Sequence, residues 1–208
     1  MDLCDSLSSI RIVEYNKYDT DVNCVLGCLC NDRGLSICKE LVKWIQLRWH
    51  LWIVFQDYPG KLYEYPALKY AQKLANQFNK PVMYLHTKGA FNDSPIQLSI
   101  RALWWHTFFV RYNECISALK KYDIVCPFTG QSKMTWYNGF IANPFAWGNV
   151  IIKPEADRYI FESLWRTREI LNTTTIYGMY GNNLNDSHAV SSALINNVSF
   201  FTSGKNSE

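Results

Sequence analysis

The chain has 208 residues, of which 48% are hydrophobic and 19% charged, a balance that excludes a disordered protein and predicts one domain spanning residues 1–208. The net charge of +3 is too mild for a dedicated nucleic-acid binder, and no apolar run reaches the roughly 20 residues of a membrane-spanning helix. The first residues lack the pattern of a signal peptide. We therefore expect a cytoplasmic protein with no nucleic-acid partner and no transmembrane segment.

Strand and helix patterns alternate along the first part of the chain. We predict strands at Ile10–Tyr15 and Leu51–Phe55, and helices at Leu35–Leu47 and Pro66–Phe78. The strand Leu51–Phe55 is apolar on both faces, which is typical of a strand inside a parallel sheet covered by helices. A turn precedes the first helix, and either Asn31 or Asp32 is suited to cap that helix.

The alternation continues in the second part of the chain. We predict strands at Pro81–Leu85, Asp123–Phe128 and Asn138–Ala142, a long helix from Ser94 to about Lys121, and helices at Glu155–Arg168 and His188–Asn196. This order predicts an α/β fold with a mostly parallel central sheet flanked by helices. Ligands of such sheets bind outside the carboxyl ends of the strands, so the loops at those ends are where functional residues are expected.

The seven cysteines leave two interpretations open. Their odd number and irregular spacing argue against a secreted disulfide scaffold. Cys24, Cys28, Cys30 and Cys38 form a local cluster, but structural zinc sites favour C-x2–4-C pairs. Buried free thiols are the favoured interpretation, and a zinc-containing interaction protein is the alternative.

The loop after the strand Pro81–Leu85 carries the richest set of functional groups. His86, Thr87, Lys88 and Gly89 supply an imidazole, a hydroxyl, an ammonium and a backbone that a ligand can approach closely. A lysine suits phosphate as a point charge. An ordinary polar turn is the alternative, and neither a Walker motif nor a dinucleotide-binding glycine pattern is present.

Three further residues are candidates for ligand binding or catalysis. Arg101, near the start of the long helix, offers a planar bidentate donor to an anion, although a surface arginine is the alternative. Asp57 follows the strand Leu51–Phe55 and is suited to accept from a base or ribose, or simply to form a turn. Glu162 lies in an apolar helical setting that favours a general base, with a salt bridge to a neighbouring arginine as the alternative.

Several stretches of the second part match the motif pattern of one family. Tyr84–Gly89 reads Y-L-H-T-K-G, and Arg101 stands at the same spacing from Tyr122-Asp123 as in that pattern. Arg158 to Glu162, followed by Trp165, matches a later R-x-x-x-E-x-W block with one extra residue. Between them, Trp136–Asn143 keeps only Gly139 clearly, and Cys126 replaces a glycine. From Pro81 to Trp165 the chain thus resembles small GT-A-type glycosyltransferases of polysaccharide and glycan assembly.

The resemblance implies a GT-A-like fold and sugar transfer from a nucleotide-sugar donor, such as a UDP-sugar, to a hydroxyl of a glycan or glycolipid acceptor. It implies that the donor is bound by Asp57, His86, Thr87, Lys88, Gly89, Arg101 and Asp123, with Glu14–Asn16 near the base. Its position before a strand, considered without the resemblance, instead predicts a structural role for Asp123. Glu162 is the expected catalytic base, and Trp136, Tyr137 and Asn138 are expected on the acceptor side, with Trp147 as a further stacking candidate.

The need for a divalent cation stays open. Many GT-A enzymes carry a D-x-D motif after the strand that corresponds to Ile124–Phe128, but this chain has no carboxylate there. Its one D-x-D, Asp19-Thr20-Asp21, follows the first predicted strand instead. No metal ligand is assigned, and Mn²⁺ and Mg²⁺ remain candidate cofactors. A non-catalytic nucleotide- or sugar-binding α/β module is the alternative function.

Overall fold

The computed structural model describes residues 10–17, 19–56, 64–87, 90, 95–130, 135, 139–152 and 174–184, and the structural statements that follow concern these residues. The strands are β1 (Arg11–Glu14), β2 (Asn23–Leu29), β3 (His50–Gln56), β4 (Val82–His86), β5 (Ile124–Gly130), β6 (Phe140–Ala142) and β7 (Ile176–Leu184). The helices are α1 (Asp32–Ile45), α2 (Tyr65–Phe78), α3 (Pro95–Trp104), the π-helical segment η1 (Trp105–Val110), α4 (Tyr112–Leu119) and α5 (Pro144–Asn149).

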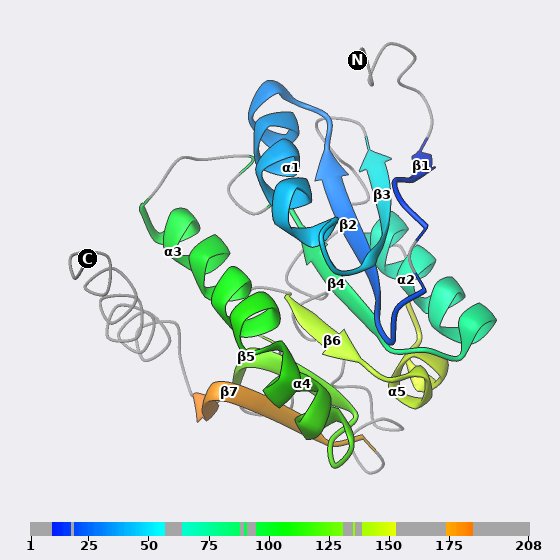
Figure 1. The fold of residues 1–208 in the computed structure, drawn as a ribbon, viewed down its shortest axis with the longest axis vertical. Helices are drawn as coiled ribbons and strands as arrows, with labels where there is room; N and C mark the ends of the chain where they lie inside the picture. Colours follow the sequence, from blue (N-terminus) through cyan, green and yellow to red (C-terminus); the bar gives the residue numbers. More distant parts are fainter. Residues whose placement is uncertain are drawn as a thin grey trace.

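These strands form a mixed sheet in the order β1-β3-β2-β4-β6-β5-β7 (Figure 1). The strand β2 runs parallel to β3 and β4, and β5 runs parallel to β7. The pairs β1–β3, β4–β6 and β5–β6 are antiparallel. The α/β class is confirmed, but the expectation of a mostly parallel sheet is wrong. Residues 131–139, which join β5 to β6, are fewer than the dozen or so that a parallel crossover requires.

Two apolar layers cover the sheet, one on each face. All seven residues of β2 are buried, and successive residues along the strand point to opposite faces. Cys24, Leu26 and Cys28 pack with α1, α3, η1 and α4, whereas Val25 packs with α2 and α5. The described part of the chain is therefore an α/β/α arrangement with β2 inside it (Figure 1).

The helix α1 shows why the sequence folds locally as it does. The side chain of Asn31 accepts a hydrogen bond from the backbone N–H of Gly34, so Asn31 is the N-cap of this helix. Its buried stripe repeats at helical spacing and consists of Ile37, Cys38, Leu41, Val42 and Ile45. The first of the two predicted capping candidates is thus confirmed.

All five predicted strands correspond to observed ones with small shifts at their ends, and β2, β7 and α5 were not predicted. The predicted long helix is divided into α3, η1 and α4. The predicted helices Glu155–Arg168 and His188–Asn196 lie outside the described residues. Among the helices described, none combines the length and the apolar character needed to cross a bilayer.

Candidate functional site

The carboxyl ends of β2, β3 and β4 meet at one edge of the sheet. In the parallel register, Cys28 lies beside Phe55 and Gly27 lies beside His86. The helix after β2 covers one face of the sheet, and the helix after β3 covers the other. In α/β sheets, a ligand binds where neighbouring strands diverge in this way. This edge, called the carboxyl edge below, is the candidate functional site.

The loop after β4 is held against the end of β2 by Thr87. The backbone N–H of Thr87 donates to the carbonyl of Gly27 at 2.9 Å, and its hydroxyl accepts from the backbone N–H of Leu29 at 3.1 Å. Thr87 is buried, so its hydroxyl fixes the loop and does not face solvent. The side-chain amide of Asn31 donates to the carbonyl of Ala90 at 3.1 Å, which ties the same loop to the N-terminus of α1.

His86 lies in a cluster of aromatic and acidic side chains at the carboxyl edge. Its Nε2 is 3.7 Å from the Glu64 carboxylate, and its ring meets the Trp104 indole edge-on, with 5.3 Å between centroids. The hydroxyl of Tyr84 donates to the other carboxylate oxygen of Glu64 at 3.4 Å. Burial, and then the nearby Glu64 carboxylate, raise the pKa of Tyr84 well above its usual value, so it stays a neutral donor.

Gly139 allows Trp104 to reach this cluster. A Cβ at Gly139 would lie 2.2 Å from the indole nitrogen of Trp104, a distance that real side chains do not adopt. Trp104 is fully buried. Gly139 is the one clearly matching position of the segment Trp136–Asn143. Packing against Trp104 gives a physical reason for a glycine there.

The sequence suggested that Arg101 lies near a helix N-terminus, but the structure does not place it there. It is in the last turn of α3, its side chain is 7% exposed, and its Nε is 3.6 Å from the carboxylate of Glu40 on α1. This placement was not predictable, because the sequence shows neither where α3 ends and η1 begins nor which helix packs beside α3. Arg101 links α3 to α1 in the described structure.

Asp123 lies at the opposite, amino edge of the sheet. Its carboxylate accepts from the side-chain amide of Asn143 at 2.9 Å and from the backbone N–H of Thr175 at 2.7 Å. Because Ile124 pairs with Ala142, and Ala142 with Val82, these contacts are level with the start of β4. The structure thus does not bring Asp123 together with His86 and Thr87, and its contacts match the structural role expected from its position before a strand.

Glu14–Asn16 also lies at the amino edge, because β1 is antiparallel to β3. Glu14 is level with Trp52, and its carboxylate is 2.7 Å from Nε2 of His50, the first residue of β3. The side chain of Asn16 accepts from the backbone N–H of Leu51 at 2.7 Å. The expectation that this segment shares an edge with the end of β4 is wrong, since the sequence does not show strand direction.

Trp147 is fully buried, and its indole N–H donates to the carbonyl of Val82 at 3.4 Å. It packs against Phe140 and is not available to stack on an acceptor sugar. The other predicted site residues, Asp57, Lys88, Gly89, Trp136, Tyr137, Asn138 and Glu162, lie outside the described residues.

The cysteine cluster does not converge on a metal site. Cys24 and Cys28 point from β2 into the layer that contains Cys38, and all three are buried free thiols. Across the described ranges, no three His, Cys, Asp or Glu side chains are grouped so that they would hold a metal ion. Burial raises the pKa of the Cys24 thiol well above its usual value, so this side chain behaves as a small apolar group.

Glu64 is the residue at the carboxyl edge that the sequence analysis missed. It immediately precedes α2, where its backbone is helical and its side chain makes no capping hydrogen bond. Its separation from His86 along the chain fits no helix or strand period. Only the pairing of β2 with β4 and the packing of α2 bring the two residues together. The available signal was its place just before Pro66, the first residue of a predicted helix.

Comparison with known proteins adds no relative to this description. No known family model matches the chain, and no curated protein matches it significantly in sequence.

Proposed function

We propose that the chain is a glycosyltransferase that binds a nucleotide-sugar donor at the carboxyl edge and transfers the sugar to a hydroxyl of a glycan or glycolipid. The observation that carries the proposal is the meeting of β2, β3 and β4 at this edge, with helices leaving to opposite faces. The capped N-terminus of α1 opens onto the same edge and favours an anion. The Y-L-H-T-K-G stretch that resembles the GT-A-type family ends β4 at this point.

In the proposed reaction, the bond from the anomeric carbon to the nucleoside diphosphate breaks, and a bond from that carbon to the acceptor oxygen forms. Lys88 neutralises the departing diphosphate, and His86 donates a hydrogen bond to it. Glu162 accepts the proton of the acceptor hydroxyl. Asp57, which directly follows β3, binds the base or ribose, and Trp136, Tyr137 and Asn138 bind the acceptor. Because Arg101 is buried beside Glu40, we assign it to packing between helices.

The first experiment locates the nucleotide. UDP is titrated into the ¹⁵N-labelled protein, with and without Mn²⁺ or Mg²⁺, and backbone amide shifts are followed. We expect saturable shifts at Leu29–Asn31 and His86–Ala90 and none at Asp123 or Asn143. Saturable shifts confined to the amino edge, or no binding by any nucleotide-sugar of a broad panel, would overturn the proposal.

The second experiment separates binding from catalysis. Lys88→Ala is expected to weaken UDP binding by about 1.5–3 kcal/mol, the range for a hydrogen bond to a charged group. Asp123→Ala is the matched control and should lower stability while it leaves UDP affinity unchanged. Glu162→Gln should bind UDP normally and lower kcat by about 10²–10⁴-fold. If Glu162→Gln binds and turns over the donor normally, the assigned base is wrong. If the wild type binds UDP but neither hydrolyses nor transfers the sugar of any nucleotide-sugar in the panel, the module alternative holds.

A further inference from the structure

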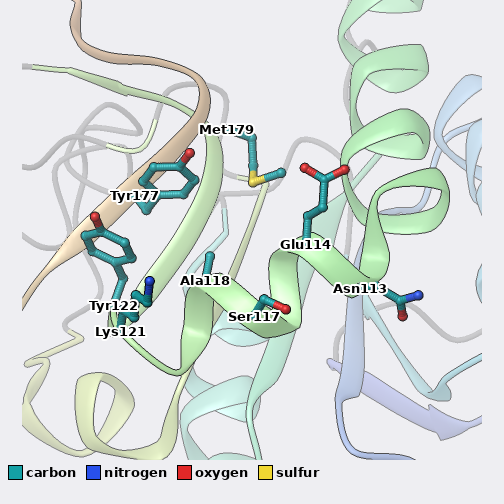
Figure 2. Close-up of a pocket in the computed structure, with 8 residues that line it drawn as sticks. All are labelled: Asn113, Glu114, Ser117, Ala118, Lys121, Tyr122, Tyr177 and Met179. Carbon is teal, nitrogen blue, oxygen red and sulfur yellow. The ribbon is translucent and has the colours of Figure 1, made fainter.

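A pocket of about 480 Å³ lies between α4 and β7, away from the carboxyl edge (Figure 2). On the helical side, the described residues that line it are Asn113, Glu114, Ser117, Ala118 and Lys121. They recur at the spacing of one helix face. Tyr177 and Met179, two apart on β7, line the other side. We call this pocket the α4–β7 groove. Its size is within the range of small-molecule sites.

One end of the groove is an aromatic surface. The rings of Tyr122 and Tyr177 stack with 4.9 Å between centroids and an angle of 22°, and both side chains are half-buried (Figure 2). Met179 extends this surface, and the small side chain of Ala118 leaves the space between them open (Figure 2). Aromatic faces carry partial negative charge and attract polarised C–H groups, which line the apolar face of a sugar ring.

The polar groups of the groove suit a neutral ligand with many hydroxyl groups. The Asn113 amide and the Ser117 hydroxyl each donate and accept hydrogen bonds, Lys121 only donates, and the Glu114 carboxylate accepts. The hydrogen bond from Arg111 holds the pKa of Glu114 below its usual value, so its carboxylate is charged at neutral pH. One carboxylate and one ammonium balance each other among the lining residues, whereas a phosphate site requires an excess of positive charge.

Two irregularities in the backbone meet beside the groove. Between Gly178 and Gly181, β7 has one residue more than β5 has between Cys126 and Phe128. The residue opposite is Pro127, which has no N–H to pair. On the helical side, η1 widens the helix just before α4. Register shifts and π-helical turns both recur at functional sites because they redirect side chains. Here the extra residue lies beside Met179, which lines the groove.

We propose that the α4–β7 groove is a carbohydrate-binding site that takes a neutral sugar of one or two rings, with a ring face against the outer face of the stacked Tyr122–Tyr177 pair and hydroxyl groups on α4. Tyr177 is level with Val125 in the amino half of β5, so the groove is distinct from the carboxyl edge. Binding of the sugar in the α4–β7 groove does not depend on whether sugar transfer takes place at the carboxyl edge.

The test uses the full chain, ¹⁵N-labelled, with maltose, lactose, cellobiose and chitobiose as probes and with inorganic phosphate and UMP as anionic comparisons. We expect at least one disaccharide to cause saturable shifts in the amides of α4 and β7, and the anions to leave these amides unchanged. No saturable shift with any of the four disaccharides, or stronger shifts there with phosphate or UMP, would overturn the proposal. UMP shifts at the carboxyl edge are scored separately, so the transferase proposal can fail while this one stands.

Two variants and two controls check the contacts. Ser117→Trp places a large side chain in the groove from an exposed helical position and should abolish the disaccharide shifts. Tyr177→Ala removes half of the aromatic surface and should weaken binding about fivefold or more. Gln77→Trp on α2 and Tyr15→Ala are exposed controls and should bind as the wild type does. Wild-type affinity in Ser117→Trp would contradict the assignment, and because this variant changes only a surface residue, the result does not depend on whether Tyr177→Ala folds.

Discussion

The Trp104 indole occupies the space that a side chain at Gly139 would need. An alanine there would place its Cβ 2.2 Å from the indole nitrogen, and the fully buried indole has no room to retreat. We expect Gly139→Ala to lower the free energy of unfolding by about 1–3 kcal/mol, the usual cost of overpacking. Urea unfolding of the wild type and the variant measures this difference.

Gly148 provides the matched control. A Cβ at Gly148 would meet only the side-chain oxygen of Asn76, at 3.8 Å, which is ordinary contact. Gly148 lies in α5, where alanine is the better helix former, so Gly148→Ala should be neutral or slightly stabilising. Equal losses of stability in the two variants would show that the clash at Gly139 is not the cause.

At the scale of single residues, the sequence revealed local chemistry but not partners. Asn31 was predictable as a cap because its hydrogen-bond partner, Gly34, is three residues away. The contact between Arg101 and Glu40 joins two helices, and the contact between His86 and Glu64 joins a strand to a helix start. Neither pair has a spacing that the sequence could reveal, because packing of separate elements creates both.

Among the elements, α2 and α5 are joined by a buried polar contact. The side-chain amide of Gln72 donates to the carbonyls of Trp147 and Val150 at 2.8 and 2.7 Å, which satisfies backbone groups at the end of α5. Gln72→Leu leaves both carbonyls buried without this donor, and we expect a loss of about 2–4 kcal/mol in the free energy of unfolding.

Gln77→Leu is the control, because it makes the same change at an exposed position of the same helix. We expect it to change the free energy of unfolding by no more than about 0.5 kcal/mol. Urea unfolding of both variants checks the difference, and a Gln72→Leu variant as stable as Gln77→Leu would contradict the role assigned to the amide.

The contact between η1 and β7 predicts a pH dependence. His106 on η1 pairs through Nδ1 with the hydroxyl of Tyr180 on β7. Burial, and then the charge of Arg111, hold the pKa of His106 below its usual value of 6.5. The unfolded chain therefore takes up the proton at a higher pH than the folded chain does, so stability falls as pH drops below about 6.5.

His106→Asn removes this titration. Between about pH 7 and pH 5, the urea midpoint of the wild type should fall more steeply than that of the variant, because only the wild type takes up this proton on unfolding. Carboxylates, which both proteins share, titrate mainly at lower pH. Identical slopes in the two proteins over this range would contradict the assignment of the proton uptake to His106.

The helical elements were predictable to the extent that their apolar stripes are regular. The apolar stripe expected for the long helix consists of Ile100, Leu103, Trp104, Phe108, Tyr112, Cys115 and Leu119. Five of these residues are buried, and Tyr112 and Leu119 are half-buried. The division into α3, η1 and α4 was not predictable, because a π-helical turn keeps the stripe facing the core while it changes the number of residues per turn. The strand β2 was missed because Asn23 and Gly27 weaken its β pattern.

For the whole molecule, the sequence predicted the class of the fold but not the directions of its strands. Alternating strand and helix patterns indicated an α/β fold, and that class is confirmed. Strand direction depends on which neighbours pair, and β1 pairs with β3, to which it is joined only through β2 and α1. This one pairing moves Glu14–Asn16 to the amino edge and separates it from the candidate site.

The sheet order predicts a gradient of local stability. The strand β2 lies between two parallel partners and is buried along its length, whereas β1 has one partner strand among the described residues and is largely exposed. Amides of β2 should therefore exchange only through global unfolding, and those of β1 through local opening. Native-state hydrogen exchange measures this, and equal protection of β1 and β2 would contradict the predicted gradient.

The short length of β6 has a mechanical consequence. This three-residue strand joins β1, β3, β2 and β4, which include the three strands of the carboxyl edge, to β5 and β7, of which β7 borders the α4–β7 groove. It pairs with β4 over three residues and with β5 over two, whereas β2 pairs with β3 over seven. A load applied across the sheet would concentrate at β5–β6. In a single-molecule pulling experiment, the described sheet would tear there first, with the proposed nucleotide site on one fragment and the proposed carbohydrate site on the other.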